Sequence, residues 1–185
     1  PTNTESFTIL NIEPQSTLQR SADLPDQLTS IERIQESEAT RTRRFELSMP
    51  MGMGMMRGGG GGGRGRGGMG GMGGEFLING RPMDMGAINE VVAMDSTEIW
   101  EIFNDSMMVH PLHIHHGQFQ ILDRDGVAPT AQEMGFKDTL KVGPGQTARF
   151  IMRFENFSDP DTAYMYHCHF LEHEDNGMMG QFTVV

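Results

Sequence analysis

The strongest chemical signal in the sequence is its single cysteine, Cys168, which lies directly between His167 and His169. His173 and Met178 follow closely in the chain. Neutral imidazole, one thiolate and a weakly bound thioether are the donors of a blue-copper electron-transfer site. This stretch therefore predicts copper bound through sulfur, with flanking imidazoles available for a second site.

A second histidine-rich stretch, His110-Pro111-Leu112-His113-Ile114-His115, occurs upstream. Successive side chains of a β-strand point to opposite faces. If residues 163–169 are extended, Cys168 takes one face and its two histidine neighbours the other. His113 and His115 likewise share a face, whereas His110 is at an odd offset and could lie on the opposite side.

Two donor sets result from this alternation. The imidazole set contains His113, His115, His167 and His169. The sulfur set contains His110, Cys168, His173 and Met178, with residues 171–179 expected to form a short helical turn and loop that folds back over the sulfur. Clustered imidazoles without sulfur suit copper that meets oxygen, and an electron at the thiolate could leave through the Cys168 backbone into either neighbouring histidine.

Two alternatives compete with this interpretation. Isolated histidines are usually surface or core residues, and a lone buried cysteine is usually a small hydrophobe. Here, however, all seven histidines lie between residues 110 and 173, and only His116 fits neither set. Zinc also binds cysteine and histidine tetrahedrally, but usually through closely spaced ligand pairs, and a second cysteine is missing.

The segments HPLHIH and YMYHCHFLEHEDNGMM resemble the C-terminal copper-binding motifs of multicopper oxidases, and more narrowly those of the bacterial periplasmic cuprous oxidases (copper-efflux oxidases). The resemblance continues through residues 117–122, 136–142 and 180–184, and covers most of residues 43–185. It implies that the sulfur set holds type 1 copper. It also implies that His113 binds type 2 copper, that His115, His167 and His169 bind the binuclear type 3 pair, and that Glu174 delivers protons to reduced oxygen.

One departure from the family is large, because its trinuclear cluster needs twice the four imidazoles that this chain supplies. The family's other four come from two His-x-His pairs in an N-terminal domain. We therefore expect a C-terminal portion of a longer enzyme that works with that N-terminal portion. Residues 1–14 would end a preceding cupredoxin domain with a strand at residues 5–12. Residues 15–42 would form a solvated linker, with a short helix at 29–38 as the alternative.

The remaining sequence indicates an all-β domain over residues 43–185. Residues 147–154 alternate apolar Ala148, Phe150, Met152 and Phe154 with Arg149 and Arg153, which is typical of a half-buried strand. Residues 97–103 form another mixed strand, and Gly143-Pro144-Gly145 signals a turn. Pattern and resemblance together predict a cupredoxin-like Greek-key β-sandwich.

The composition of the sequence excludes several classes of binding partner. The net charge of −11 argues against nucleic acid as a partner. The single cysteine permits no internal disulfide and fits a metal role. The sequence contains no apolar run of about 18 residues, so no membrane span is expected. The resemblance implies a periplasmic or extracellular location.

Residues 49–74 hold seven methionines within a glycine-dominated segment that also carries three arginines. Such composition predicts a disordered insert. Because soft thioethers select Cu(I), and because inserts of this kind occur here in the cuprous oxidases, a role toward substrate Cu(I) is the functional hypothesis. An RGG-like nucleic-acid segment is the alternative.

Met49 and Met108 align with two methionines of the family's substrate site, while the two aspartates of that site fall on Gly54 and Ser106. Met107 and Met108 are candidates for an electron entry surface, with core packing as the alternative.

These observations together predict an oxidase that takes single electrons from Cu(I), and less selectively from phenols, and reduces dioxygen to water. Two other functions stay open at this point. One is a general laccase-like phenol oxidase. The other is a stand-alone cupredoxin that carries electrons or binds copper without oxygen chemistry.

Overall fold

A computed structural model describes residues 10–14, 22–23, 25–26, 28–50 and 75–185. The chain divides into two units, residues 1–31 and residues 32–185. Most of the strand expected at 5–12 lies outside the described residues, and residues 10–14 have no regular secondary structure. The insert at 49–74 also lies outside them from residue 51 onward, so both expectations stay predictions.

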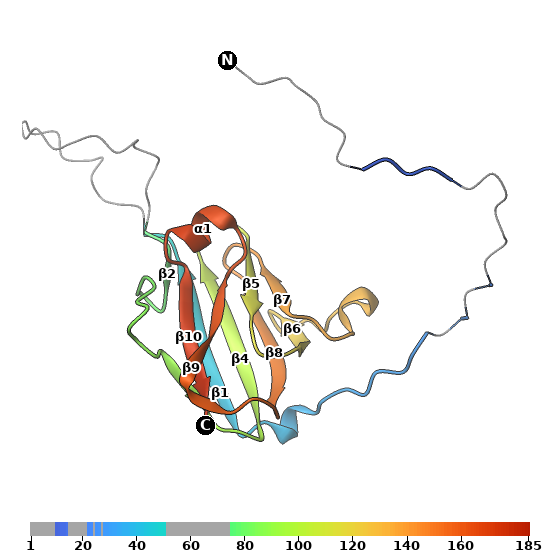
Figure 1. Cartoon of the computed structure of the whole chain (residues 1–185), viewed down its shortest axis with the longest axis horizontal. Helices are drawn as coiled ribbons and strands as arrows, with labels where there is room; N and C mark the ends of the chain where they lie inside the picture. The colour runs from blue at the N-terminus through green and yellow to red at the C-terminus, as the bar shows by residue number, and fades with distance from the viewer. Residues whose placement is uncertain (1–9, 15–21, 24, 27, 51–74) are drawn as a thin grey trace, which may run out of the picture. The chain divides into compact units, whose positions relative to one another are not determined.

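Residues 32–185 fold into two five-stranded sheets (Figure 1). The first sheet has the order β2 (Leu77–Ile78), β1 (Arg41–Ser48), β4 (Ser96–Asp105), β8 (Thr147–Phe154), β6 (Phe119–Arg124). The second has the order β3 (Glu90–Val92), β10 (Met179–Val184), β9 (Asp159–Cys168), β5 (His110–Ile114), β7 (Thr139–Val142). The chain changes sheet at every connection from β3 to β9. The predicted all-β, cupredoxin-like sandwich is confirmed.

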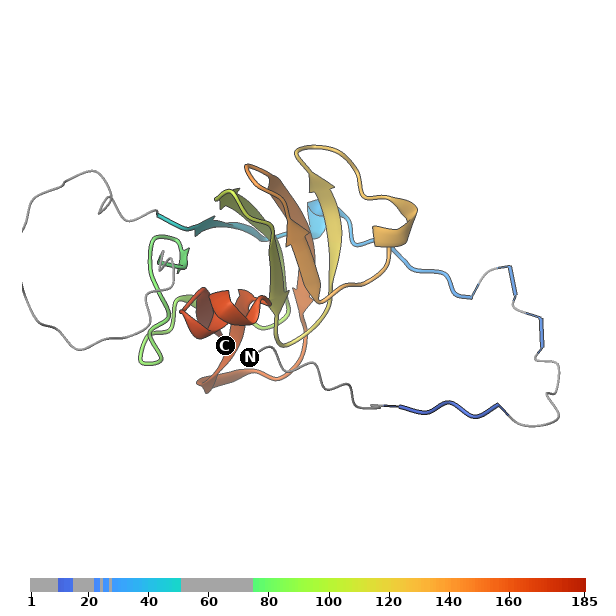
Figure 2. The same ribbon diagram turned by 90° about the horizontal axis from the view of Figure 1, so that it is seen from above.

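Helical structure within the described residues is short. It comprises α1 (Leu171–Asp175) and the 3-10 turns η1 (Glu36–Glu38) and η3 (Ala131–Glu133). The helix α1 lies at one end of the sandwich, opposite the C terminus, and Figure 2 looks down onto this end. Among the residues that the structure describes, no helix is long and apolar enough to cross a membrane.

Strand β8 shows how the sequence pattern builds the core. Its four alternating apolar side chains are fully buried, and they pack between the sheets with Trp100, Phe119 and Phe182. Ile151 is also fully buried, although it points to the outer face of the sheet. The predicted half-buried strand is therefore also covered at Ile151 on its outer face, and a segment outside the sandwich must cover it there.

That covering segment begins at Glu32. Ile34 packs on Ile99 and Ile151, and its backbone N–H donates to Gln120 Oε1 over 2.9 Å. Glu36 pairs with Arg149, and Glu38 pairs with Arg153. The compact unit therefore begins at residue 32, whereas a solvated linker was expected as far as residue 42. Two acidic residues of the expected linker, Glu36 and Glu38, are thus partners of the outward arginines of β8.

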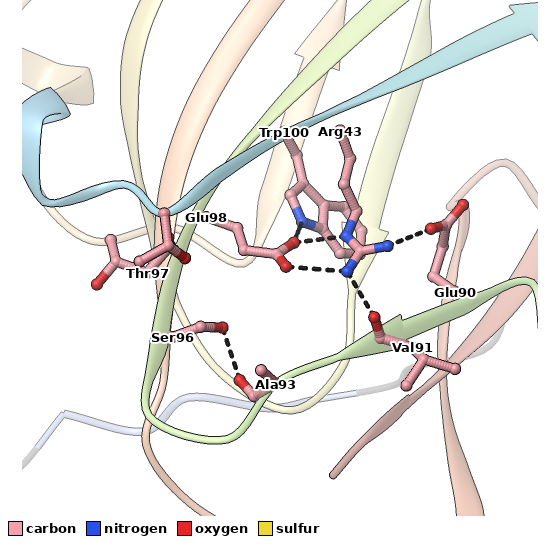
Figure 3. A network of polar contacts seen from close by, with 9 residues as sticks. Arg43, Glu90, Val91, Ala93, Ser96, Thr97, Glu98 and Trp100 are labelled. Atoms are coloured by element: carbon pink, nitrogen blue, oxygen red, sulfur yellow. Dashed lines mark hydrogen bonds and ion pairs between the residues drawn. The ribbon is translucent and has the colours of Figure 1, made fainter.

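A buried ionic network ties the two sheets together at β1, β3 and β4 (Figure 3). Arg43 Nε and Nη2 donate to the two carboxylate oxygens of Glu98 over 2.5 and 2.9 Å. The same guanidinium pairs with Glu90 and donates to the Val91 carbonyl over 2.6 Å. Trp100 Nε1 donates to Glu98 over 3.0 Å. Bidentate geometry and further hydrogen bonds are what a buried charge pair requires.

Replacement of Arg43 by alanine should lower the free energy of unfolding by about 3–5 kcal/mol, because the buried Glu98 carboxylate would lose its counter-charge. Arg44→Ala is the matched control, since its side chain is 80% exposed and pairs with Glu101 at the surface. That variant should lose about 0–1 kcal/mol. Urea unfolding of the metal-free protein measures both, and equal losses would contradict the assignment of the network.

Candidate metal centre

The pairing of β5 with β9 builds the site. Leu112 lies opposite Cys168, and His113 lies opposite His167. Directly opposed residues of an antiparallel pair share a face. Cys168 therefore points into the core with Leu112, and the adjacent histidines point outward. His110 is fully buried on the inner face, as its odd offset from His113 predicted.

The sulfur set converges inside the end of the sandwich that α1 covers. Cys168 Sγ lies 3.5 Å from His110 Nδ1 and 3.3 Å from His173 Nδ1, and the two Nδ1 atoms are 3.2 Å apart. Met178 is fully buried in the same core cluster as Cys168. The Cys168 N–H donates to the Met178 carbonyl over 3.0 Å, which holds the returning loop against β9.

Phe76 completes the wall of this set and was missed in the sequence. Its ring stacks on His173 with a centroid distance of 4.5 Å. It is buried, and it follows the methionine- and glycine-rich segment almost immediately. The available signal was its position as the first aromatic residue after that segment.

The imidazole set gathers on the outer face of the second sheet. Ring centroids of His113 lie 5.1, 5.4 and 5.5 Å from those of His115, His167 and His169. His115 Nε2 and His167 Nε2 are 3.3 Å apart. His113, His115 and His167 offer ligand atoms that lie within 4.8 Å of one another, and the His169 ring adjoins them.

Contacts behind these rings orient them. His113 Nδ1 lies 3.0 Å from the Asp138 carbonyl, which leaves its Nε2 free to face the set. The Glu174 carboxylate, carried by α1, lies 3.3 Å from His167 Nδ1. His116 takes no part in either set. Its Nε2 lies 2.5 Å from the Asn156 carbonyl, and its ring packs against Tyr164.

Burial controls the protonation of the sulfur set. It lowers the pKa of His110 to about 4 and also lowers the pKa of His173. It raises the pKa of the Cys168 thiol to about 11. The set is therefore two neutral imidazoles and a thiol facing one another within the apolar core. A bound cation would favour the thiolate, and two imidazoles, one thiolate and a thioether fit copper.

The comparisons with known proteins agree with this geometry. Residues 63–185 match the model of the family described as multicopper oxidase. The chain is 44% identical over 118 residues to a multicopper oxidase of Staphylococcus haemolyticus, covering 62% of this chain and 26% of that protein. The chain thus spans about a quarter of this relative's length.

Solved structures give the same result. A laccase-like multicopper oxidase, CueO, from an Ochrobactrum species has a TM-score of 0.71 and 32% identity, with 91% of this chain and 36% of that chain covered. A Campylobacter jejuni multicopper oxidase, described as a metallo-oxidase, has a TM-score of 0.68 and 28% identity, with coverages of 89% and 34%.

Fold and donor sets define a cupredoxin-like copper domain. The matched residues show more narrowly that this chain belongs to the multicopper oxidase family, whose cofactor is copper.

If Cys168 binds copper, the copper-loaded protein should show an intense blue absorption, and Cys168→Ser should abolish it, because that absorption requires a copper–thiolate bond. The fold should persist, as measured by circular dichroism. His116→Asn is the control, since residue 116 has a φ of 82° that asparagine tolerates, and it lies outside both sets. A blue band that survives in Cys168→Ser would contradict the ligand assignment.

Proposed function

We propose that this chain holds type 1 copper through His110, Cys168, His173 and Met178. It also supplies half of a trinuclear cluster, with His113 toward type 2 copper and His115, His167 and His169 toward the type 3 pair. The observation that carries this proposal is the division of the donors by β9, which separates a buried sulfur set from an outward imidazole set within three consecutive residues.

Bound copper supplies one-electron redox chemistry at the sulfur set and the reduction of dioxygen to water at the imidazole set. The chain's own residues prepare both places. Full burial of His110 and Cys168 excludes water from the sulfur set. The Cys168 backbone joins that set covalently to His167 and His169. Glu174, 3.3 Å from His167, is placed to hold a proton beside the imidazole set.

The remaining imidazoles are proposed to come from the N-terminal portion of the same oxidase, on two His-x-His pairs. The exposure of His115 and His169 supports this, because half of the imidazole set is open to solvent in the described structure. The relative from S. haemolyticus is long enough to contain such a portion, since this chain covers 26% of it.

The proposed electron donors are Cu(I) and, less selectively, phenols. Met107 is 83% exposed and Met108 is 44% exposed, which argues against core packing for either side chain. Ser48 pairs with Leu77 and with Asp105, so the described residues on both sides of the methionine-rich insert lie beside the end of β4, which Met107 and Met108 follow. Met49 lies at one of those ends. The similarity to a metallo-oxidase supports Cu(I), and the oxidase activity of the Ochrobactrum CueO towards lignin model compounds supports phenols.

A donor of this kind fits an enzyme of copper homeostasis in the periplasm or outside the cell. The general laccase-like phenol oxidase differs from this proposal only in donor preference. The stand-alone cupredoxin differs in lacking oxygen chemistry, and the clustering of His113, His115 and His167 on the outer face argues against it.

Copper stoichiometry tests the proposed function directly. The 185-residue chain alone should bind one tightly held blue copper. Addition of the N-terminal portion should bring in three further coppers per chain and produce oxygen uptake, because only then is the imidazole set complete. Elemental analysis and an oxygen electrode measure both quantities. A single copper and no oxygen uptake in the complete assembly would favour the electron carrier.

Donor preference is tested in the complete oxidase with the double variant Met107→Ala/Met108→Ala. It should lower kcat/KM for Cu(I) about tenfold, the effect of losing roughly 1.4 kcal/mol of thioether contact, and leave phenol oxidation unchanged. Met85→Ala/Met134→Ala is the control, because these side chains are similarly exposed elsewhere, at 71% and 43%. Deletion of residues 49–72 should also reduce Cu(I) turnover, and unchanged turnover in both variants would exclude the methionine surface.

A further inference from the structure

The side of His110 that faces away from the sulfur set meets the turn between β4 and β5. Ser106 Oγ lies 2.7 Å from His110 Nε2. Since His110 is fully buried, this hydroxyl is the contact that satisfies Nε2. Either atom could be the donor in an isolated pair, because a hydroxyl and a neutral imidazole each donate and accept. The surrounding hydrogen bonds decide the direction.

The orientation of the Asn104 side-chain amide is fixed by its neighbours. Its amide nitrogen lies 2.7 Å from the Met108 carbonyl and 3.1 Å from the Val142 carbonyl. Both carbonyls can only accept, so the NH2 group of this fully buried side chain must face them. Asn104 Oδ1 is thereby turned toward Ser106, where it accepts from the backbone N–H over 3.0 Å and faces the hydroxyl over 2.7 Å.

The direction of the Ser106 hydroxyl hydrogen bond follows from this orientation. Asn104 Oδ1 can only accept and lies 2.7 Å from Ser106 Oγ, the same distance as His110 Nε2, so the one hydroxyl hydrogen must lie between the two oxygens, whose lone pairs would otherwise face each other. The Met108 carbonyl, at 3.3 Å, is the weaker acceptor. The Met108 N–H donates to Ser106 Oγ over 3.2 Å. With its hydrogen directed to Asn104 Oδ1, Ser106 can only accept from His110. The proton of the neutral imidazole must therefore be on Nε2.

We propose that Asn104 and Ser106 are positioning residues that hold His110 as the Nε2–H tautomer, with the lone pair of Nδ1 facing Cys168 Sγ and His173 Nδ1. The inference rests on the proposed function only in taking that lone pair as a copper ligand. A ligating histidine usually donates its other ring N–H to a fixed acceptor, which sets its tautomer and orientation. Here that acceptor is a neutral hydroxyl, and a buried amide fixes its direction.

The hydrogen bonds that run from Asn104 through Ser106 to His110 lie next to the exposed methionines. Met107 and Met108 follow Ser106 directly and are exposed, so the turn that fixes the tautomer is the same turn that reaches solvent. The rigidity of this turn comes from Asn104, which binds Met108 within the turn and Val142 on β7 of the opposite sheet.

The tautomer is measured on the metal-free chain labelled with 15N-histidine, through two-bond proton–nitrogen correlations at a pH where His110 is neutral. The proposal expects a protonated Nε2 and an unprotonated Nδ1 for His110. A protonated Nδ1, or an averaged mixture of the two forms, would overturn it. This measurement requires no copper, so its outcome is independent of the proposed oxidase function.

Ser106→Ala removes the acceptor. It should give a mixture of tautomers and weaken Cu(II) binding at the blue site about 10- to 100-fold, measured by chelator competition. Ser106→Thr retains the hydroxyl and should restore both properties. Ser96→Ala is the matched control, because this serine of β4 bonds the Ala93 carbonyl and makes no contact with His110 in the described structure.

Unchanged tautomer and affinity in Ser106→Ala would overturn the proposal. If that variant does not fold, the wild-type spectrum and the Ser106→Thr affinity still decide. If the wild-type chain shows the expected tautomer but forms no blue copper site, the result would count against the proposed function. The proposed roles of Asn104 and Ser106 would still stand.

Discussion

The alternation of side chains along β9 is the constraint on which the rest of the structure depends. Because the inner face of the second sheet packs against Trp100 and the phenylalanines of the core, only alternate residues of β9 can point inward. Cys168 takes an inward position, and the two adjacent histidines must point outward. A register slip of one residue would exchange the faces and bring the imidazoles into the core. The Leu112–Cys168 and His113–His167 pairs fix that register.

The sulfur set then depends on a short return of the chain. Helix α1 brings His173 back over Cys168, and Gly177 adopts a φ of 96° so that Met178 re-enters the core. Phe76 covers the far side of His173 from a different part of the chain. Each donor is neutral when buried, as the lowered histidine pKa values and the raised cysteine pKa indicate. The apolar core can therefore form before a metal binds, and binding then displaces the thiol proton.

Much of the site followed from local pattern alone. The parity of 110, 113 and 115, the parity of 167–169 and the helical turn after residue 170 are short-range properties, and the structure shows each of them. Strand β8 followed from its alternation for the same reason. These features are set by backbone geometry within a few residues, which a sequence displays directly.

The features that sequence could not supply are contacts between distant segments. Ile34 was read as part of a linker because its partners, Ile99 and Ile151, are far away in the sequence. Phe76 and His173 are similarly distant, and the direction of the Ser106 hydroxyl depends on a carbonyl of β7 reached through Asn104. Only the packing of the two sheets brings these groups together, so their roles become visible only in three dimensions.

The most direct test of the central claim is anomalous X-ray diffraction at the copper edge from crystals of the copper-loaded chain. The alternation of β9 predicts an anomalous peak within the sandwich, enclosed by Cys168 Sγ and the Nδ1 atoms of His110 and His173. It also predicts that His167 and His169 face the opposite side of the sheet. A peak bound instead by exposed methionines or surface carboxylates, with Cys168 unligated, would contradict the account.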